Sequence, residues 1–266
     1  IISKKIVLNF GESPDVVRLR TPAGMVTSKQ LRKIADIAEK YGRGEVHCSV
    51  RQCVELLYIP WDDFGPVIEE LKEAGLKVAF CGPRFRVPTA CGGCTYNPNG
   101  LTDTLKMCKE ADKRYFGWET RHHKFKVAFS GCPIDCTRTR EMDLGFQGIV
   151  RPALIEEKCN GCGLCVQTCE ENALRMEEEL PIRDWKKCIG CGDCIKICPR
   201  ETMVTEKVGW LARAGGKHGK HPLVAKEIAT FLSDEEVFAL IESVFNWYRK
   251  NGEGRERIGH TIRRLG

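Results

Sequence analysis

The sequence predicts an α+β fold with a small cysteine-rich segment inserted into its second half. Strand-like and helix-like segments alternate before residue 75, and eight cysteines crowd into residues 153–205. Further helix-like and strand-like segments flank that stretch on both sides. Of the 266 residues, 42% are apolar and 29% are charged, so the chain can bury a core and disorder is not expected. We predict three units: residues 1–75, residues 76–152 continued by 206–266, and an insert at 153–205.

The first unit has the order strand, helix, strand, strand, helix, which is typical of a ferredoxin-like layer. Residues 16–22 predict the first strand, and residues 61–74 predict a second helix closed by Gly75. The first helix is capped by Thr27 or Ser28, and its apolar residues recur at helical spacing: Leu31, Ile34, Ala35, Ala38 and Tyr41. Residues 44–52 and 54–59 predict paired strands. In the former, Val46, Cys48 and Val50 are expected to face inward, with His47, Ser49 and Arg51 on the opposite face.

The second unit contains three further clear elements. Residues 101–115 predict a helix and residues 124–130 predict a strand. Near the C-terminus, Ser233 and Glu236 form a capping-box pair at the start of another helix. The apolar residues of that helix share one face: Val237, Leu240, Ile241, Val244, Phe245 and Tyr248.

Cysteine is the most unusual component of the chain, with sixteen copies. This number indicates either a secreted disulfide protein or a metal protein in a reducing compartment. Eight of the cysteines form two copies of C-x2-C-x2-C-x3-C, in CNGCGLCVQTC and CIGCGDCIKICP. This is the bacterial ferredoxin spacing, in which the fourth cysteine of each run ligates the cluster of the other run. Zinc or disulfides remain the alternative, but zinc sites seldom use two identical four-cysteine runs.

The insert therefore predicts a two-cluster ferredoxin unit that holds two [4Fe–4S] clusters. The crossed arrangement gives one cluster Cys159, Cys162, Cys165 and Cys198, and the other Cys169, Cys188, Cys191 and Cys194. Glycines at 161, 163, 190 and 192 permit the positive φ angles of such loops. Pro199 follows the second run as the pattern expects, whereas Glu170 stands in the corresponding place after the first.

Two more cysteine pairs lie in loops rich in glycine and proline. Cys91 and Cys94 occur in TACGGCTYNPNG, and Cys132 and Cys136 occur in FSGCPIDCTRTR. Both loops follow strand-like stretches, so the spacing is consistent with a third cluster. A structural zinc site fits the same spacing.

Four motifs in this order resemble the sulfite and nitrite reductase family: RLRTPAGMVTSKQL, HCSVRQ, KFKVAFSGCPIDC and GGKHGKHP. The resemblance extends to the C-terminal helix and the GRERIG tail, and it is closest to dissimilatory-type and anaerobic sulfite reductases with a ferredoxin insert. It implies a ferredoxin-like half-domain, followed by an α/β domain that binds sirohaem and a coupled [4Fe–4S] cluster. With the insert, the expected cofactors are sirohaem and three [4Fe–4S] clusters.

The resemblance implies a ligand set for the coupled cluster. The family pattern is C-x5-C followed by C-x3-C, and its last cysteine bridges the cluster to the sirohaem iron, which makes Cys136 the bridging ligand. Counting from Cys91, the second family cysteine falls on Asn97, and Cys94 is the nearby substitute. We therefore expect the ligands Cys91, Cys94, Cys132 and Cys136, with a non-cysteine fourth ligand as the alternative to Cys94.

The resemblance also implies that Arg20, Arg51, Lys124 and Lys126 hold and protonate the substrate anion. Taken alone, each of these residues could equally be a solvated surface charge. Arg18 lies two residues before Arg20 and is the alternative to it. Lys217, His218 and Lys220 in GGKHGK, with Arg138 after the bridging cysteine, are expected to bind the sirohaem carboxylates.

The charge pattern bears on partners. The formal net charge of +6 is small, and no aromatic-interleaved basic stripe is present, so nucleic acid is not an expected partner. No run of eighteen apolar residues and no leader pattern occurs, so we expect no membrane span, no signal peptide and a cytoplasmic protein. Because each motif of the family resemblance occurs once, we expect a homodimer that encloses sirohaem between two copies; a monomer is the alternative.

The function expected from these features is a six-electron reduction of sulfite to sulfide by an iron–sulfur oxidoreductase. Electrons from an unknown donor protein are expected to enter at the ferredoxin clusters and to pass through the third cluster to sirohaem. The alternatives are nitrite reduction to ammonia at the same site, and a non-catalytic subunit for electron transfer or sulfur delivery.

Overall fold

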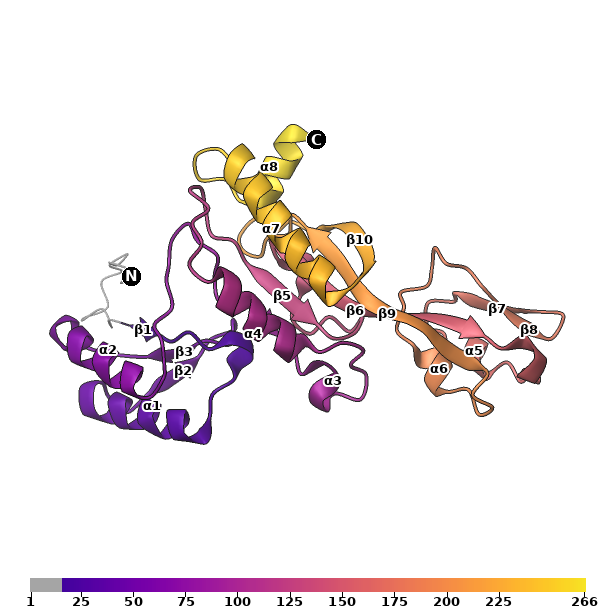
Figure 1. Ribbon diagram of the computed structural model, residues 1–266, viewed down its shortest axis with the longest axis horizontal. Coiled ribbons are helices and arrows are strands. Elements are labelled where there is room, and N and C mark those ends of the chain that lie inside the picture. The colour runs from indigo at the N-terminus through magenta and orange to yellow at the C-terminus, as the bar shows by residue number, and fades with distance from the viewer. Residues whose placement is uncertain (1–15) are drawn as a thin grey trace.

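A computed structural model describes residues 16–266 and shows an N-terminal lobe, a central sheet and a cysteine-rich lobe (Figure 1). The two lobes lie at opposite ends of the molecule, with the sheet between them. Residues 1–15 of the first predicted unit lie outside the described residues.

The N-terminal lobe is a three-stranded antiparallel sheet with two helices. Its strands are β1 (Val17–Arg18), β2 (Val46–Cys48) and β3 (Val54–Leu56), in the order β1-β3-β2. Its helices are α1 (Ser28–Tyr41) and α2 (Phe64–Glu73). Thr27 and Gln30 form a full capping box at the start of α1. Leucine, isoleucine and valine side chains of both helices pack on β3 to form the core of this lobe.

Two predictions for this lobe were wrong. The strand expected over 16–22 contains only Val17–Arg18, because Pro22 begins a 3-10 turn. The expected inward face of residues 46–50 is outside: Val46 is 42% exposed and Val50 is fully exposed. β2 is an edge strand, and the chain turns between Ser49 and Cys53, where Gln52 has a φ of 61°. This turn directs Arg51, instead of Val50, toward the rest of the protein.

Burial along α1 also differs from the expectation. Ile34 and Ala38 are buried as expected, but Leu31 and Ala35 are exposed, and Ile37 takes a core position. The cysteines outside the motifs differ in exposure: Cys53 and Cys108 are buried, whereas Cys48 is exposed. All sixteen cysteines lie in the described part of the chain, and none forms a disulfide.

The central sheet has five strands in the order β10-β9-β6-β5-β4. The short strands β4 (Thr89–Ala90) and β5 (Val127–Ser130) run parallel to β6 (Leu144–Leu154). β9 (Met203–Ala214) is antiparallel to both β6 and β10 (Lys226–Leu232). β6 and β9 pair from Leu144 with Ala214 to Leu154 with Met203, and this ribbon extends from the core into the cysteine-rich lobe (Figure 1).

Helices α4 (Thr104–Tyr115) and α7 (Asp234–Asn251) cover the sheet, and the small helices α3 (Gly93–Tyr96) and α8 (Ile258–Leu265) lie beside them. The Tyr115 hydroxyl donates to Glu242 over 2.9 Å and joins α4 to α7. Beneath them, the stacked rings of Phe129 and Phe146 meet the edge of Trp210. The helix predicted over 101–115 begins three residues later, because Asp103 caps it.

The cysteine-rich lobe occupies the chain between β6 and β9. It contains the one-turn helices α5 (Leu164–Gln167) and α6 (Asp193–Lys196) and the hairpin of β7 (Leu174–Glu177) with β8 (Leu180–Arg183). Gly163 and Gly192 precede the two helices with φ angles of 71° and 82°, which other residues rarely adopt. The described helices include none with the length and hydropathy needed to cross a bilayer.

The capping box at α7 generates a test of the fold. Ser233 Oγ accepts the Glu236 backbone N–H, and the Glu236 carboxylate accepts the Ser233 N–H over 2.7 Å. Ser233→Ala is expected to lower the free energy of unfolding by about 1 kcal/mol. Ser243→Ala, at an exposed position inside the same helix, is the matched control and is expected to keep or slightly raise stability, because alanine favours helices more than serine does. Thermal unfolding of both variants measures the difference, and equal midpoints would contradict the capping role.

Candidate functional site

The cysteines of the repeated motif line two separate cavities. One cavity is lined by Cys159, Cys162, Cys165 and Cys198, which we call the outer set. The other is lined by Cys169, Cys188, Cys191 and Cys194, which we call the inner set. Each set draws three cysteines from one run and the fourth from the other run, as the crossed spacing requires. The thiols therefore have the grouping that suits two four-cysteine clusters. Among residues 16–266, no group of three or more potential ligands converges as a single-ion metal site.

The remaining loop thiols gather where β4 and β5 end. Cys91 follows β4, and its Sγ accepts the Gly131 backbone N–H over 3.1 Å. Burial raises the pKa of the Cys132 thiol, and the adjacent Cys91 and Cys136 thiols raise it further. These three thiols therefore lie near one another. The thiols of Cys94 and Cys136 are exposed.

Close backbone contacts hold the two loops together. A Cβ on Gly131 would lie 2.6 Å from the Gly93 Cα, and a Cβ on Gly100 would lie 2.2 Å from the Gly93 carbonyl carbon. Leu101 N–H donates to the Gly131 carbonyl over 2.7 Å, and Cys94 N–H donates to the Thr102 carbonyl over 3.0 Å. Glycine is required at these positions because any side chain would force the cysteine loops apart.

Polar side chains fix the loop that carries Cys132 and Cys136. The hydroxyls of Ser130 and Thr137 lie 2.7 Å apart, and Ser130 also accepts the Thr137 N–H. Asp135, at a φ of 56°, accepts the Thr139 N–H over 2.8 Å. Asn97, at the position of the expected family cysteine, accepts the Asn99 N–H over 3.0 Å and so closes its own turn. Asn97 therefore has a local structural use.

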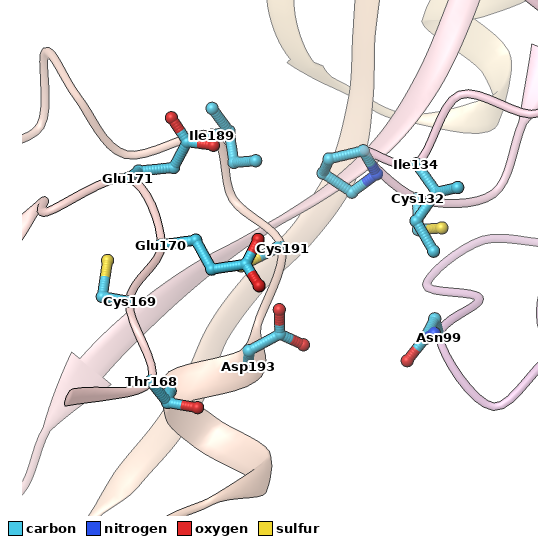
Figure 2. Close-up of a pocket in the computed structure, with 11 residues that line it drawn as sticks. Asn99, Cys132, Ile134, Thr168, Cys169, Glu170, Glu171, Ile189, Cys191 and Asp193 are labelled. Carbon is cyan, nitrogen blue, oxygen red and sulfur yellow. The ribbon is translucent and has the colours of Figure 1, made fainter. Parts of the chain in front are cut away.

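A pocket of about 260 Å³ separates the thiol loops from the inner set. Figure 2 shows Cys132 and Asn99 on one side and Cys169, Glu170 and Glu171 on the other. Lys196 Nζ donates to Asn99 Oδ1 over 2.7 Å and joins the two sides. The inner set contributes Cys169 and Cys191 to this pocket. The inner set therefore lies across this pocket from Cys132.

A second pocket, of about 200 Å³, is crowded with positive charge. Its cationic side chains, which define the cationic pocket, are Arg18, Arg51, Arg86, Lys124 and Lys126. Arg51 is held by a 2.5 Å hydrogen bond from Nη2 to the Val87 carbonyl, just before β4. Lys124 and Lys126 lie immediately before β5 and both line the pocket, although the strand itself does not include them. The structure thus brings together three of the four predicted anion-binding residues.

Burial and the neighbouring positive charges lower the pKa values of four of these cations, whereas the Glu55 carboxylate raises the pKa of Arg18. Burial, together with the charges of Arg51, Arg257 and Lys124, lowers the pKa of Lys126 to about 7. Burial also lowers the pKa of Arg51 to about 10, and it lowers the pKa values of Lys124 and Arg86. An anion in this pocket would relieve the repulsion, so the pocket is electrostatically suited to bind one.

A buried ion pair supports the floor of the cationic pocket. Arg257 donates to both oxygens of the fully buried Asp143, over 2.9 Å and 2.5 Å. The second Asp143 oxygen also accepts the Lys126 backbone N–H over 2.8 Å. Asp143 is therefore largely neutralised by Arg257 while it fixes the Lys126 backbone.

Arg20 does not line the cationic pocket, so its predicted place there is corrected. Its Nε donates to Asp112 over 2.8 Å, and its guanidinium lies 3.8 Å from the centre of the Phe116 ring. Arg18, two residues earlier, lines the pocket and pairs with Glu55 over 2.5 Å. The two arginines would share a face along a regular strand, but β1 ends at Arg18. The 3-10 turn that follows packs against α4 and carries Arg20 to that helix.

The GGKHGK turn lies against the loop that follows Cys136. His218 Nδ1 lies 2.7 Å from the Glu141 carboxylate, and a Cβ on Gly216 would lie 2.5 Å from the Met142 carbonyl oxygen. Lys217 closes a small hairpin through paired backbone hydrogen bonds with Leu223. Lys220 and Arg138 are exposed on these two neighbouring segments. The proposed cofactor-binding residues therefore share one region of the surface.

Sequence reasoning missed three residues of the site, Arg86, Asp143 and Arg257, and it named Arg18 only as a competitor of Arg20. Arg257 lies in the GRERIG tail, which is part of the family resemblance but has no residue with a predicted role. Arg86 lies in PRFR without a periodic signal. Their convergence depends on long-range packing between α8, β6 and the N-terminal lobe, which local patterns do not report.

Two family models match the chain. Residues 12–74 match the nitrite/sulfite reductase ferredoxin-like half domain. Residues 81–266 match the nitrite and sulphite reductase 4Fe-4S domain. Together these matches include both the lobe that supplies Arg51 and the sheet that carries the thiol loops.

Similar proteins include several sulfite reductases. The chain is 34% identical over 253 residues to coenzyme F420-dependent sulfite reductase from Methanocaldococcus jannaschii, covering 94% of this chain and 40% of that protein. The chain thus spans about two fifths of the length of that relative. It is 27% identical over 271 residues to one component of the anaerobic sulfite reductase from Salmonella typhimurium, covering 93% of this chain and 79% of that one.

The fold is also similar to a solved structure. The crystal structure of dissimilatory sulfite reductase I superposes with a TM-score of 0.80 at 22% sequence identity. The superposition covers 95% of this chain and 67% of the other.

The glycine contacts between the thiol loops yield one prediction. Gly131→Ala is expected to push the Cys132 loop away from Gly93. The iron content per chain of the purified protein is then expected to fall by the content of one cluster. Gly65→Ala is the matched control, because a Cβ there meets no atom within 4 Å. Iron analysis of anaerobically purified protein measures the effect. Unchanged iron in Gly131→Ala would show that the two loops do not share a cluster.

The lowered pKa of Lys126 yields a prediction for the dependence of stability on pH. The folded protein releases this proton near pH 7, whereas the unfolded chain holds it up to the ordinary lysine pKa of 10.5. Between these values the unfolded state binds more protons, so this group makes the folded state more stable as pH rises. We expect the thermal midpoint of the wild type to rise relative to that of Lys126→Met between about pH 6 and about pH 9. Parallel midpoints across this range would contradict the lowered pKa, and the exposed Lys109→Met variant is the control.

Proposed function

Because this chain belongs to the nitrite and sulfite reductase family, we propose that it is a sirohaem-dependent sulfite reductase that converts sulfite to sulfide with six electrons. The observation that carries this proposal is the cationic pocket, where five cations meet beside the strand that leads to Cys91. Sulfite is a small, highly charged oxyanion, which such a pocket suits.

The proposed cofactor sites follow the thiol groups. Cys91, Cys94, Cys132 and Cys136 would hold a [4Fe–4S] cluster, with Cys136 as the bridge to sirohaem. The outer and inner sets would hold two further clusters in a ferredoxin unit at residues 153–205, inserted between 76–152 and 206–266. Arg138, Lys217, His218 and Lys220 would bind the sirohaem carboxylates. When bound, sirohaem would supply the redox-active iron at which sulfur is reduced.

The residues of the chain would supply binding and protons. Arg51 and Arg86 present planar guanidinium groups to the oxygens of the anion. Lys126 is suited to proton transfer, since a group with a pKa of about 7 both gives and regains a proton near neutral pH. The three oxygens of sulfite leave as water, so protons must reach each of them. Lys124, in the same pocket, keeps the site positive while Lys126 is deprotonated.

We further propose that two copies of the chain form a homodimer around two sirohaem sites. Each motif of the family resemblance occurs once, and a two-fold pair is the commonest closed assembly. The exposed Cys136 and Arg138 are available to face a second copy. Co-expression of an Arg51→Ala chain with a Cys136→Ser chain tests this arrangement. Restored turnover in the mixture supports shared sites, whereas inactive mixtures together with a monomeric mass would contradict it.

The test of function is turnover under a reduced viologen dye, with sulfite and nitrite as separate substrates. We expect a sirohaem absorption spectrum and sulfide formation. Preferential ammonia formation from nitrite would reassign the substrate within the same family. Absence of both activities from protein with full cofactor content would contradict a reductase and favour a subunit for electron transfer or sulfur delivery.

Arg86 provides the sharpest variant in this assay, because Arg84 in the same segment is a matched control. Arg86 lines the cationic pocket, whereas Arg84 pairs with Glu119 at the surface. Arg86→Leu is expected to reduce kcat/KM for sulfite by roughly tenfold to a hundredfold, the usual range for loss of a charge-assisted contact. Arg84→Leu is expected to retain wild-type turnover. Equal activity of the two variants would exclude Arg86 from anion binding.

A further inference from the structure

The two cysteine runs belong to an internal repeat whose halves differ at one contact position. LIEEKCNGCGLCVQTC begins at Leu154, and RDWKKCIGCGDCIKIC begins at Arg183. Each of these residues stands five positions before the first cysteine of its run, at the end of a strand that borders a thiol cavity. Leu154 lines the cavity of the outer set, and Arg183 lines the cavity of the inner set. The repeat therefore places an apolar side chain at one thiol set and a cation at the other.

Arg183 makes direct contacts with the inner set. Its Nη1 donates to the Cys188 Sγ over 3.5 Å, and its Nη2 donates to the Cys194 Sγ over 3.5 Å. Its Nη2 also lies 3.4 Å from the Met203 sulfur, and its guanidinium lies 5.3 Å from the centre of the Trp185 ring. The side chain is half-buried and Cys194 is only 6% exposed, so solvent screens the charge incompletely.

The outer set receives hydrogen bonds from neutral groups. Thr202 donates its backbone N–H to the Cys198 Sγ over 3.3 Å, and its hydroxyl lies 3.2 Å from the same sulfur. Ala173 stands at the equivalent position of the other run, four residues after its fourth cysteine, and donates its N–H to the inner-set Cys169 over 3.4 Å. The backbone contact is therefore common to both sets, whereas the charge of Arg183 belongs to the inner set.

A cation that donates to thiolate ligands stabilises the reduced form of a cluster more than the oxidised form, because reduction adds a negative charge. The inner set is also the one that lies across the pocket of Figure 2 from Cys132. Resting on the clusters of the proposed function, we propose that Arg183 raises the reduction potential of the inner cluster through its direct contacts with Cys188 and Cys194, against the carboxylates of Glu171 and Asp193 in the same cavity, and so favours an electron beside Cys132. Electron transfer between the two clusters moves one electron from the outer cluster to the inner cluster. No bond changes and no proton moves.

The test is a redox titration of anaerobically purified whole protein, followed by electron paramagnetic resonance. Arg183→Leu gives the inner set the residue of its repeat partner. In this variant, the midpoint potential of the inner cluster is expected to fall by about 59 mV. At the wild-type midpoint, the ratio of reduced to oxidised cluster would then be about tenfold lower, as for any one-electron couple. Leu154→Arg, which places a cation at the outer set, is expected to raise the midpoint potential of the other cluster. Arg175→Leu is the matched control, because Arg175 lies on the same hairpin but pairs with Glu177.

Iron counts separate the outcomes. Full iron with unchanged potentials in both Arg183→Leu and Leu154→Arg would overturn this inference and leave the proposed reductase intact. A wild-type protein without the two ferredoxin-type clusters would overturn it together with the cofactor assignment. If Arg183→Leu loses iron, Arg183→Gln removes the charge while keeping an amide donor, and it is expected to shift the same component downward. An Arg183→Gln variant with full iron and the wild-type potential would contradict the role of the charge.

Discussion

The paired strands β6 and β9 are the constraint on which the rest of the structure depends. Their ladder begins beside Asp143 in the central sheet and ends at Leu154 and Met203, which line the cavity of the outer thiol set. One continuous ribbon therefore fixes the cysteine-rich lobe relative to the loops that carry Cys91 and Cys132 (Figure 1). Because backbone hydrogen bonds along such a ribbon resist sliding, the order of the thiol groups in space follows from its register.

The cationic pocket shows the energetic consequence of building a site for an anion. Five cations share one pocket, and the buried carboxylates beside them are already paired, Glu55 with Arg18 and Asp143 with Arg257. This arrangement opposes folding, as the lowered pKa of Lys126 shows. The same repulsion makes the pocket receptive to a small oxyanion. The proposed function thus accounts for a feature that a purely structural role would leave unexplained.

Local sequence patterns identified much of the fold, but not the contacts that complete the site. The capping residues Thr27 and Ser233 marked the start of α1 and α7, because caps depend only on nearby residues. The spacing of Cys159 to Cys198 also predicted the crossed grouping of thiols found in the two cavities. By contrast, Val50 was expected inside, and Arg20 was expected in the pocket. Tertiary packing decided both, since the turn at Gln52 exposes Val50 and Asp112 captures Arg20.

The proposed electron path runs from the outer set to the inner set, and across the pocket of Figure 2 to the loops after β4 and β5. The most direct test is an anomalous difference map, measured at the iron absorption edge, from crystals of anaerobically purified protein. We predict three multi-iron peaks at these thiol groups, and one further single-iron peak for the sirohaem that Cys136 would hold. A map with iron at fewer thiol groups, or with single zinc ions at any of them, would contradict this prediction.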